Sequence, residues 1–373
     1  KHFNIFFITL LTMGSVCAQP DLESRYRGSI LASAIGDAMG KVTEFKSMDQ
    51  IHAYYPHGLQ NFDQFVPQDW LHYDGTPWED DQGNRIAPFT DDTQMAIMVL
   101  KTLIDYPTDS WRHLETIGCR NSIQLDLFMW SIAYRFNDWY LDSDGGRSID
   151  RAPGNACKHG CEVLRQRFSK EETMVCPPFR SWDVGAINAG GCGTVMHTFP
   201  FGLVLPHNLE LCEFLAVEHS KLSHGHPWAL AACGAMAVGV AEVINQKSVD
   251  EVLDVMIAIA RKHDNQTADL IEWAREQAHN KVDSAIVFDR LRSWTAHEAI
   301  AAAAYIFAVS PDDVVEAIRL GVNTPGDSDS IAAMAGALVG ARCGVEAIPN
   351  DLIKTVEKSQ ELQNLAKKII PAL

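Results

Sequence analysis

The sequence has few basic residues for its size. It holds 31 Lys and Arg against 48 Asp and Glu, so its formal net charge at pH 7 is −17 over 373 residues. A surface with this excess of negative charge repels nucleic-acid phosphates and anionic lipid headgroups. We therefore expect no nucleic-acid partner and no anionic membrane partner. A small phosphate-bearing ligand held through a metal ion stays compatible with the charge.

The sequence also lacks alternating segments long enough for a sheet, internal repeats, low-complexity tracts and a recognisable linker. Hydrophobic residues make up 47% of the chain and charged residues 21%, as in an ordinary globular protein. After the N-terminus, each long apolar region is rich in Ala and Gly and is interrupted by charge, so none is expected to span a membrane. These absences favour one large globular domain.

The N-terminus is the one place with an uninterrupted apolar run. Residues 3–13 are almost wholly apolar, follow a short basic start, and precede small residues that end at Ala18. This pattern predicts a secretory signal peptide over residues 1–18. A buried core helix is the alternative, but Pro20 and the polar residues after it argue against it. The domain would then cover residues 19–373, and the protein would be secreted or periplasmic, with no membrane association after cleavage.

Four cysteines lie close together in sequence, at Cys157, Cys161, Cys176 and Cys192. In an exported chain we expect them to form disulfides or to remain free thiols. A zinc site with His159 is the alternative, but the uneven spacing of the cysteines makes it a poor fit to zinc-binding patterns.

Helical periodicity dominates the rest of the chain. From Ile331, apolar residues recur three, four, seven and eight positions later, which is the spacing of one helix face. Residues 49–88 and 142–188 are rich in turn residues and are expected to be irregular. The predicted fold class is all-α, a single large multi-helix bundle, with further helices at residues 26–39, 93–103, 125–140, 209–219, 228–244, 249–262, 268–279, 296–309, 311–320 and 350–370.

Two predicted helices begin with a cluster of acidic and hydroxyl residues. The clusters are Thr90, Asp91 and Asp92 in one place and Asp327, Asp329 and Ser330 in the other. Helix capping explains one side chain per helix. Each cluster has more oxygen ligands than capping needs, and carboxylates crowd together when a hard cation such as Mg²⁺ or Mn²⁺ lies between them. If the two helix starts converge, they form a two-metal site.

Glycines mark a third segment, residues 188–197, which includes Gly190, Gly191 and Gly193. Glycines that lead into a helix expose backbone N–H groups, and this arrangement holds phosphates. No Lys follows the last Gly, so the segment is not a Walker motif. A tight turn with close helix packing is the alternative. His224 precedes another helix and is expected to contact substrate or to cap that helix.

Together these segments resemble the ADP-ribosylglycohydrolase family, which includes dinitrogenase reductase-activating glycohydrolase and the ADP-ribosylhydrolases. The matching pieces occur in the family's order over most of the chain. They are residues 36–44, which end at Glu44, the Thr90 and Asp327 clusters, the glycine loop and the His224 segment. Each piece is weak by itself, and the ordered set is specific.

The resemblance implies an all-α fold, two Mg²⁺ ions with Mn²⁺ as the alternative, and a small-molecule or ADP-ribosylated substrate. The metal ligands it implies are Thr90, Asp91, Asp92, Asp327, Asp329 and Ser330. Its catalytic residues are Glu44, which matches the family's mobile glutamate, Asp92 and Asp327. The substrate-binding residues are Asn155, Gly190, Gly191, Gly193, Thr194, Val195, Met196 and His224.

The sequence departs from the family pattern in three places. Ser330 stands where Thr is usual, which keeps the hydroxyl group, and His197 stands where Arg is common. An acidic residue that many members carry near positions 152–155 is absent here. The leading hypothesis is metal-assisted hydrolysis of the C1 glycosidic bond of an ADP-ribosyl group by an exported enzyme. The alternatives are hydrolysis of another riboside or glycoside outside the cytoplasm, or a non-catalytic ADP-ribose-binding or structural relative.

Overall fold

The structure is a computed structural model that describes residues 20–106, 123–171, 179–291 and 294–369. All regular secondary structure in these ranges is helical, so the all-α prediction is confirmed. The signal-peptide prediction for residues 1–18 and the pairing of Cys176 lie outside the described residues. Among the described cysteines, Cys157, Cys161 and Cys192 are free buried thiols.

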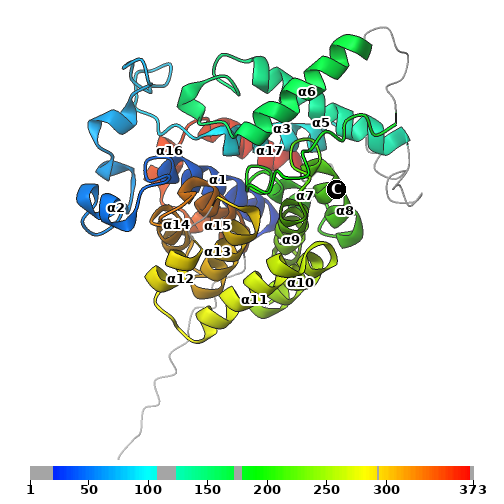
Figure 1. Ribbon diagram of the computed structural model, residues 1–373. Coiled ribbons are helices and arrows are strands. Elements are labelled where there is room, and N and C mark those ends of the chain that lie inside the picture. The colour runs from blue at the N-terminus through cyan, green and yellow to red at the C-terminus, as the bar shows by residue number, and fades with distance from the viewer. Residues whose placement is uncertain (1–19, 107–122, 172–178, 292–293, 370–373) are drawn as a thin grey trace, which may run out of the picture.

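In the part of the chain that the structure describes, the longest stretches without an α-helix are residues 55–90 and 179–198 (Figure 1). The bounds of the helices are α1 Leu22–Gly40, α2 Met48–Tyr54, α3 Asp91–Asp105, α5 Ile123–Leu141, α6 Asn155–Glu171, α7 Phe199–Val204, α8 Leu209–Ser220, α9 Pro227–Ile244, α10 Val249–His263, α11 Asn265–His279, α12 Ser284–Arg290, α13 Ala296–Val309, α14 Val314–Val322, α15 Ser328–Cys343, α16 Asn350–Thr355 and α17 Ser359–Ile369.

The centre of the molecule is the antiparallel pair α1 and α15 (Figure 1). Glycines let the two backbones touch along their length. A Cβ atom on Gly28 would lie 2.4 Å from the carbonyl oxygen of Gly340, and one on Gly40 would lie 2.4 Å from the Cα atom of Asp329. No side chain fits at such distances, so the small residues are a packing requirement. The pairing fixes the start of α15 beside the end of α1.

Helices α9, α13 and α14 pack around α15. Helix α9 is long and apolar enough to span a membrane by length and composition, although 83% of its apolar window is buried inside the protein. The sequence-based expectation that no later segment would meet this test was therefore wrong. The interruption by charge is a single residue, Glu242, near the end of the helix. Burial on all sides explains why the helix is apolar all round.

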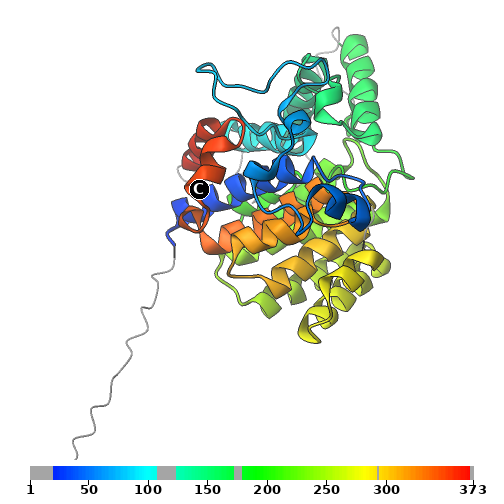
Figure 2. The ribbon, with the colours of Figure 1, turned by 90° about the vertical axis from the view of Figure 1, so that its left-hand side faces the viewer.

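Three predictions of helix position needed correction. Helix α2 begins at Met48 and runs into residues 49–88, which were expected to be irregular, because Ser47 and Gln50 form a capping box at its start. Helix α6 forms inside residues 142–188, which were expected to be irregular. Its buried face is made by Cys157, Cys161 and Leu164, at helical spacing. The helix predicted over residues 350–370 is broken between α16 and α17, because the Glu357 amide donates to the Ala87 carbonyl at 3.0 Å. Figure 2 shows α16 and α17 in red beside the start of α1, where Arg27 donates to Gln363.

Candidate active site

Helix α1 brings the two acidic helix starts together. The buried Asp37 carboxylate of α1 accepts four hydrogen bonds at 2.6–2.9 Å, from the backbone amides and hydroxyl groups of Thr90 and Thr93. These bonds hold the first turn of α3. One turn further on, Gly40 contacts the first turn of α15, and its carbonyl accepts from the Ser328 hydroxyl at 2.9 Å. The convergence that the sequence left open therefore follows from the packing of one helix.

A cleft of about 830 Å³ opens where these helix starts meet the glycine loop and the beginning of α6. Most of the predicted site residues line it. They are Glu44, Asp91, Asp92, Asn155, Gly190, Gly191, Gly193, Met196, His224, Asp327, Asp329 and Ser330. Thr90, Thr194 and Val195 were also predicted as site residues, but they are fully buried and do not line the cleft.

The capping alternative holds for one helix start and fails for the other. Thr90 is the N-cap of α3, and its hydroxyl accepts from the Asp92 amide at 3.3 Å. Asp327 occupies the N-cap position of α15, but its side chain makes no capping hydrogen bond. Its Oδ2 atom instead accepts from the Cys192 thiol at 2.9 Å. The acidic side chain at the start of α15 is therefore directed at the cleft.

The carboxylates of the cleft fit a hard divalent cation. One carboxylate oxygen each from Glu44, Asp327 and Asp329 lie within 4.8 Å of one another. The Oδ2 atom of Asp92 is buried and has no hydrogen-bond partner among the described residues. A buried carboxylate oxygen without a donor is costly unless a cation binds it. Oxygen donors of this kind are the ligands that Mg²⁺ and Mn²⁺ prefer.

Burial and mutual repulsion perturb these acids. Burial raises the pKa of Asp91, Asp92 and Asp329 well above the usual range, and neighbouring carboxylates raise it further. The pKa of Glu44 rises to about 8, first from burial and then from the charges of Asp327 and Asp37. Without a cation, these acids cannot all be ionised at once. In this respect they differ from acidic groups on the surface. We call Glu44, Asp91, Asp92, Asp327 and Asp329 the acidic cleft.

The glycine loop forms a second wall of the cleft. After Gly193 the chain makes a turn, and α7 begins only at Phe199, so the expected helix start at the loop is wrong. The glycines have little free space around them. A Cβ on Gly190 would lie 3.1 Å from the Trp228 ring, and one on Gly191 would lie 3.4 Å from the Trp294 ring. These distances fit the alternative of a tight turn with close packing, and the role of the loop in holding phosphate stays a prediction.

Two histidines support this wall. The Nε2 atom of His197 lies 2.9 Å from the Gly193 carbonyl, and the Nδ1 atom of His224 lies 2.8 Å from the Ser223 hydroxyl. Burial lowers the pKa of His197 to about 3 and that of His224 to about 4, so both rings are neutral at pH 7. His197 stands where the family that the sequence resembles commonly has Arg. Its neutral ring contacts the carbonyl of the glycine loop.

The structure places three residues in the cleft that the sequence did not single out as site residues. Cys157, Cys192 and the half-exposed Trp294 all line the cleft. The two cysteines were noted for disulfides and not for their position. Nothing in the local sequence marks Trp294 as a cleft residue.

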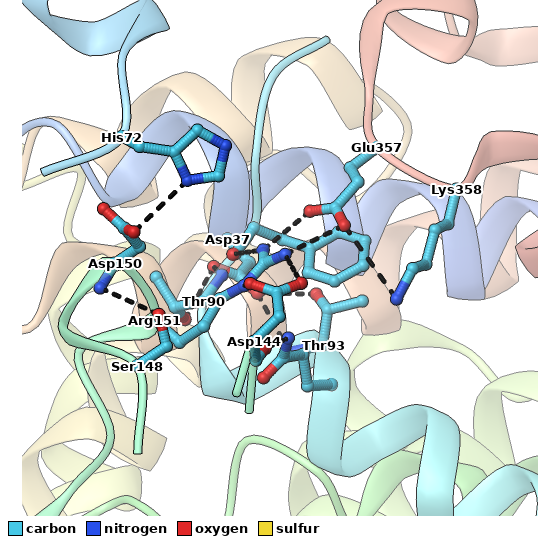
Figure 3. Close-up of polar contacts among 12 residues, drawn as sticks. Asp37, His72, Thr90, Thr93, Asp144, Ser148, Asp150, Arg151, Glu357 and Lys358 are labelled. Carbon is cyan, nitrogen blue, oxygen red and sulfur yellow. Dashed lines mark hydrogen bonds and ion pairs between the residues drawn. The ribbon is translucent and has the colours of Figure 1, made fainter. Parts of the chain in front are cut away.

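A buried arginine ties the cleft wall to distant segments (Figure 3). Arg151 is fully buried, and its guanidinium forms ion pairs with Asp144 at 2.6 Å and with Glu357 at 2.7 Å. It also donates to the Phe89 carbonyl at 2.6 Å and lies 4.6 Å from the centre of the Trp78 ring. We call Arg151, Asp144 and Glu357 the arginine cluster.

The arginine cluster is connected to the acidic cleft through the chain on both sides. Phe89 immediately precedes Thr90 and the first turn of α3. On the other side, Arg151 precedes the cleft-lining residues Ala152 and Gly154, and the Gly154 amide donates to Asp91 Oδ2 at 3.3 Å. The cluster therefore positions one wall of the cleft without entering it.

The fold and the cleft define an all-α protein with a buried acidic group that could hold a metal ion. Residues 18–373 match the family model described as ADP-ribosylglycohydrolase, and the chain belongs to this family of metal-dependent hydrolases of ADP-ribose glycosidic bonds.

Named relatives match over most of their length. The chain is 25% identical to ADP-ribosylarginine hydrolase Tri1 of Pseudomonas putida, covering 92% of this chain and 77% of the relative. It is 24% identical to ADP-ribosyl-[dinitrogen reductase] glycohydrolase of Rhodospirillum rubrum, covering 92% and 93%. A solved structure titled "ADP-ribosylglycohydrolase-related protein complex" matches with a TM-score of 0.61 at 21% identity, covering 94% of this chain and 98% of that one. This last match supports the fold.

Proposed function

We propose that this protein is a Mg²⁺-dependent hydrolase that cleaves the C1 glycosidic bond of an ADP-ribosyl group. The observation that carries the proposal is the acidic cleft, where buried carboxylates that form no ion pair with the described residues face a glycine-lined wall. Membership of the ADP-ribosylglycohydrolase family supports the substrate class. The oxygen donors support Mg²⁺, with Mn²⁺ as the alternative, because hard cations prefer carboxylate ligands.

The residues of the cleft would divide the work between binding and chemistry. Asp92 and Asp327 would hold the metal from opposite helix starts, with Asp91, Asp329 and Ser330 beside them. Two bound ions would stabilise negative charge and lower the pKa of a bound water. Gly190, Gly191 and Gly193 would bring backbone close to the diphosphate, and the neutral His224 would hydrogen bond to the substrate next to them.

Glu44 is the proposed proton acceptor. It follows the end of α1 and forms one edge of the acidic cleft, where it is partly open to solvent. A carboxylate in this position can accept the proton of an attacking water and pass it to the leaving group. In the metal-free protein, burial and the neighbouring carboxylates raise its pKa to about 8. A bound cation would lower this pKa again, so that the ionised form accepts the proton.

We propose further that the substrate lies outside the cytoplasm, because residues 1–18 have the pattern of a secretory signal. Relatives named for ADP-ribosylarginine and for ADP-ribosylated dinitrogen reductase make a protein-linked or arginine-linked ADP-ribosyl group the first substrate to test. Expression of the full sequence tests the location. A cleaved product outside the cytoplasm supports export, and an uncleaved cytoplasmic product rejects it.

The test of function combines binding and turnover. Thermal unfolding is measured with ADP-ribose, once with Mg²⁺ and once with EDTA, and hydrolysis of ADP-ribosylarginine is measured under the same conditions. Ligand at ~100 times its Kd adds about 2.7 kcal/mol, which raises the midpoint by a few degrees. We expect stabilisation and hydrolysis only with Mg²⁺. Stabilisation by Mg²⁺ without any response to ADP-ribose would redirect the search to another riboside. No response to either ligand would reject the proposed function.

A further inference from the structure

A second hollow, of about 530 Å³, lies beside the acidic cleft. The two share Ala152 and Pro153 as lining residues, so they are neighbours along one short segment of the chain. None of the described residues that line the second hollow is acidic, and two of them, Arg147 and Lys158, are basic. We call this place the basic hollow. In a chain with a net charge of −17 it is a local reversal of charge right next to the carboxylates of the acidic cleft.

Lys158 occupies a position that helix stability does not explain. It lies in the first turn of α6, is half-buried, and forms no ion pair with the described residues. The N-terminus of a helix carries a partial positive charge, so a Lys in the first turn is unfavourable, and this first turn contains no acidic residue to offset it. An anion bound next to Lys158 would compensate both positive charges.

Arg147 is exposed, and its guanidinium lies 5.1 Å from the centre of the Tyr140 ring, which also lines the basic hollow. Carboxylates in this part of the chain already have other partners. Glu162 accepts from the Tyr140 hydroxyl at 2.6 Å, and Asp144 pairs with Arg151 at 2.6 Å. Arg147 itself forms no ion pair with the described residues, so its donors are available to a ligand.

Ser148 adds a hydroxyl group to the lining of the basic hollow. Its Oγ atom accepts from the Asp150 amide at 3.3 Å (Figure 3), and the hydroxyl proton is donated to none of the described residues. A guanidinium fork, an ammonium group and a hydroxyl donor together are a combination that binds phosphate groups. The basic hollow therefore has the donors for an anion that the acidic cleft would repel.

We propose that the basic hollow binds a phosphate group that the substrate carries outside its diphosphate, for example on the adenosine ribose. The inference rests on the proposed function, since the acidic cleft and the glycine loop would hold the ADP-ribosyl group itself. A phosphate monoester carries up to about two negative charges near neutral pH, which Arg147 and Lys158 together balance. The basic hollow would then select phosphorylated over plain ADP-ribosyl substrates without contacting the reacting atoms.

The experiment compares ADP-ribose with ADP-ribose 2′-phosphate by calorimetry on the full-length protein in Mg²⁺. We expect the wild type to bind the phosphorylated ligand on the order of tenfold more tightly. Arg147→Met and Lys158→Met should each reduce this preference to about threefold or less, and the double variant should abolish it. Inorganic phosphate should compete for the basic hollow, so it should lower the affinity for ADP-ribose 2′-phosphate and leave that for ADP-ribose unchanged.

The chain offers a control of equal charge. Arg165 is another exposed basic residue of α6, and it lies outside the basic hollow. Arg165→Met changes the net charge as Arg147→Met does and should keep the preference. Arg147→Lys keeps the charge without the fork and should keep part of the preference. Circular dichroism checks folding, and Lys158→Met removes an unfavourable charge from the first turn of α6, so it should not destabilise the protein.

Two results would overturn this inference and leave the proposed function intact. One is equal affinity of the wild type for both nucleotides, and the other is an equal loss of preference in Arg165→Met. A rise in ADP-ribose affinity on addition of inorganic phosphate would also overturn it, because the basic hollow would then take a free ion and not a group of the substrate. Failure of both nucleotides to bind in Mg²⁺ would reject the proposed function itself.

Discussion

The arginine cluster and the acidic cleft both bury carboxylates, but they treat the charge differently. In the arginine cluster, Glu357 is 6% exposed and its two oxygens accept from the Arg151 guanidinium at 2.7 and 3.0 Å. In the acidic cleft, Asp92 is equally buried and one of its oxygens has no partner among the described residues. Burial alone therefore does not mark a ligand site. A missing partner marks one only where further carboxylates share a cleft, because Glu242 Oε2 is also buried without a partner among the described residues but does not line the cleft.

Asp37 sharpens this contrast because it lies between the two regions. It is fully buried, and four hydrogen bonds from Thr90 and Thr93 satisfy it without a cation. Burial raises its pKa, and these hydrogen bonds act in the opposite direction. Satisfied carboxylates such as Asp37 hold the elements in place, whereas those of the acidic cleft are available to a ligand.

The largest effect is expected from Asp327→Asn in the acidic cleft. Loss of one ligand carboxylate removes several kcal/mol of charge stabilisation, so we expect hydrolysis of ADP-ribosylarginine to fall on the order of 10⁴-fold. The metal-free variant should unfold at the same temperature as the wild type or higher, because one of the mutually repelling acids is gone. Activity within tenfold of the wild type would show that Asp327 has no part in the reaction.

The next effect is expected from Arg151→Met in the arginine cluster. This change leaves the buried Glu357 with only Lys358, whose Nζ atom lies 3.9 Å from Glu357 Oε1. Removing the close partner of a buried charge costs about 3–5 kcal/mol in the free energy of unfolding. Urea denaturation measures the loss. Arg151→Lys is the control, since it keeps the charge but not the two-pronged geometry, and it should recover part of the stability. A loss below about 1 kcal/mol for Arg151→Met would mean that the cluster does not hold these segments together.

The sequence was sufficient to predict the fold class and the acidic helix starts, because both are local patterns. Helical periodicity appears within a few turns, and carboxylates before an apolar run mark a helix start. Their convergence was not predictable, because it depends on α1 packing against α15 at the far end of the chain. The resemblance to the family, and not the local patterns, implied that both clusters belong to one metal site.

The arginine cluster was missed for a physical reason. Arg151 and Glu357 are 206 residues apart, and neither lies in a motif. Their meeting depends on the break between α16 and α17, where Glu357 pairs with Ala87. Helix α6 was missed because Cys157 and Cys161 were considered as disulfide or metal residues and not as part of an apolar face.

A third prediction concerns how the acidic cleft makes the stability of the protein depend on pH. An acid whose pKa is raised in the folded state binds more protons in the folded than in the unfolded protein. Its contribution to the free energy of unfolding is therefore fully present below the ordinary carboxyl pKa. That contribution is lost as the pH rises toward about 8, the pKa of Glu44. Each such acid contributes up to about 1.4 kcal/mol per pH unit. We expect the free energy of unfolding in EDTA to fall between pH 5 and pH 8 relative to that in Mg²⁺, because the ion replaces the protons.

The comparison of EDTA with Mg²⁺ is necessary because the buried histidines act in the opposite direction. The lowered pKa values of His197 and His224 cause stability to be lost as pH falls below their ordinary value of 6.5. This effect is present in both conditions and cancels in the difference. A difference between EDTA and Mg²⁺ that does not change with pH would contradict the raised pKa values in the acidic cleft.

The smallest effect is expected from an exposed ion pair between α3 and α17. Lys101 of α3 contacts Glu361 of α17 at 2.8 Å, with side chains 35% and 37% exposed. Glu361→Gln should cost about 0.2–1 kcal/mol, because water screens the pair and two long side chains lose freedom to form it. At ~1 M salt the Debye length is about 3 Å, so the cost should vanish, whereas the cost of Arg151→Met should persist. If salt lowered the costs of Glu361→Gln and Arg151→Met equally in urea denaturation, the arginine cluster would be open to solvent. Burial would then not explain its contrast with the acidic cleft.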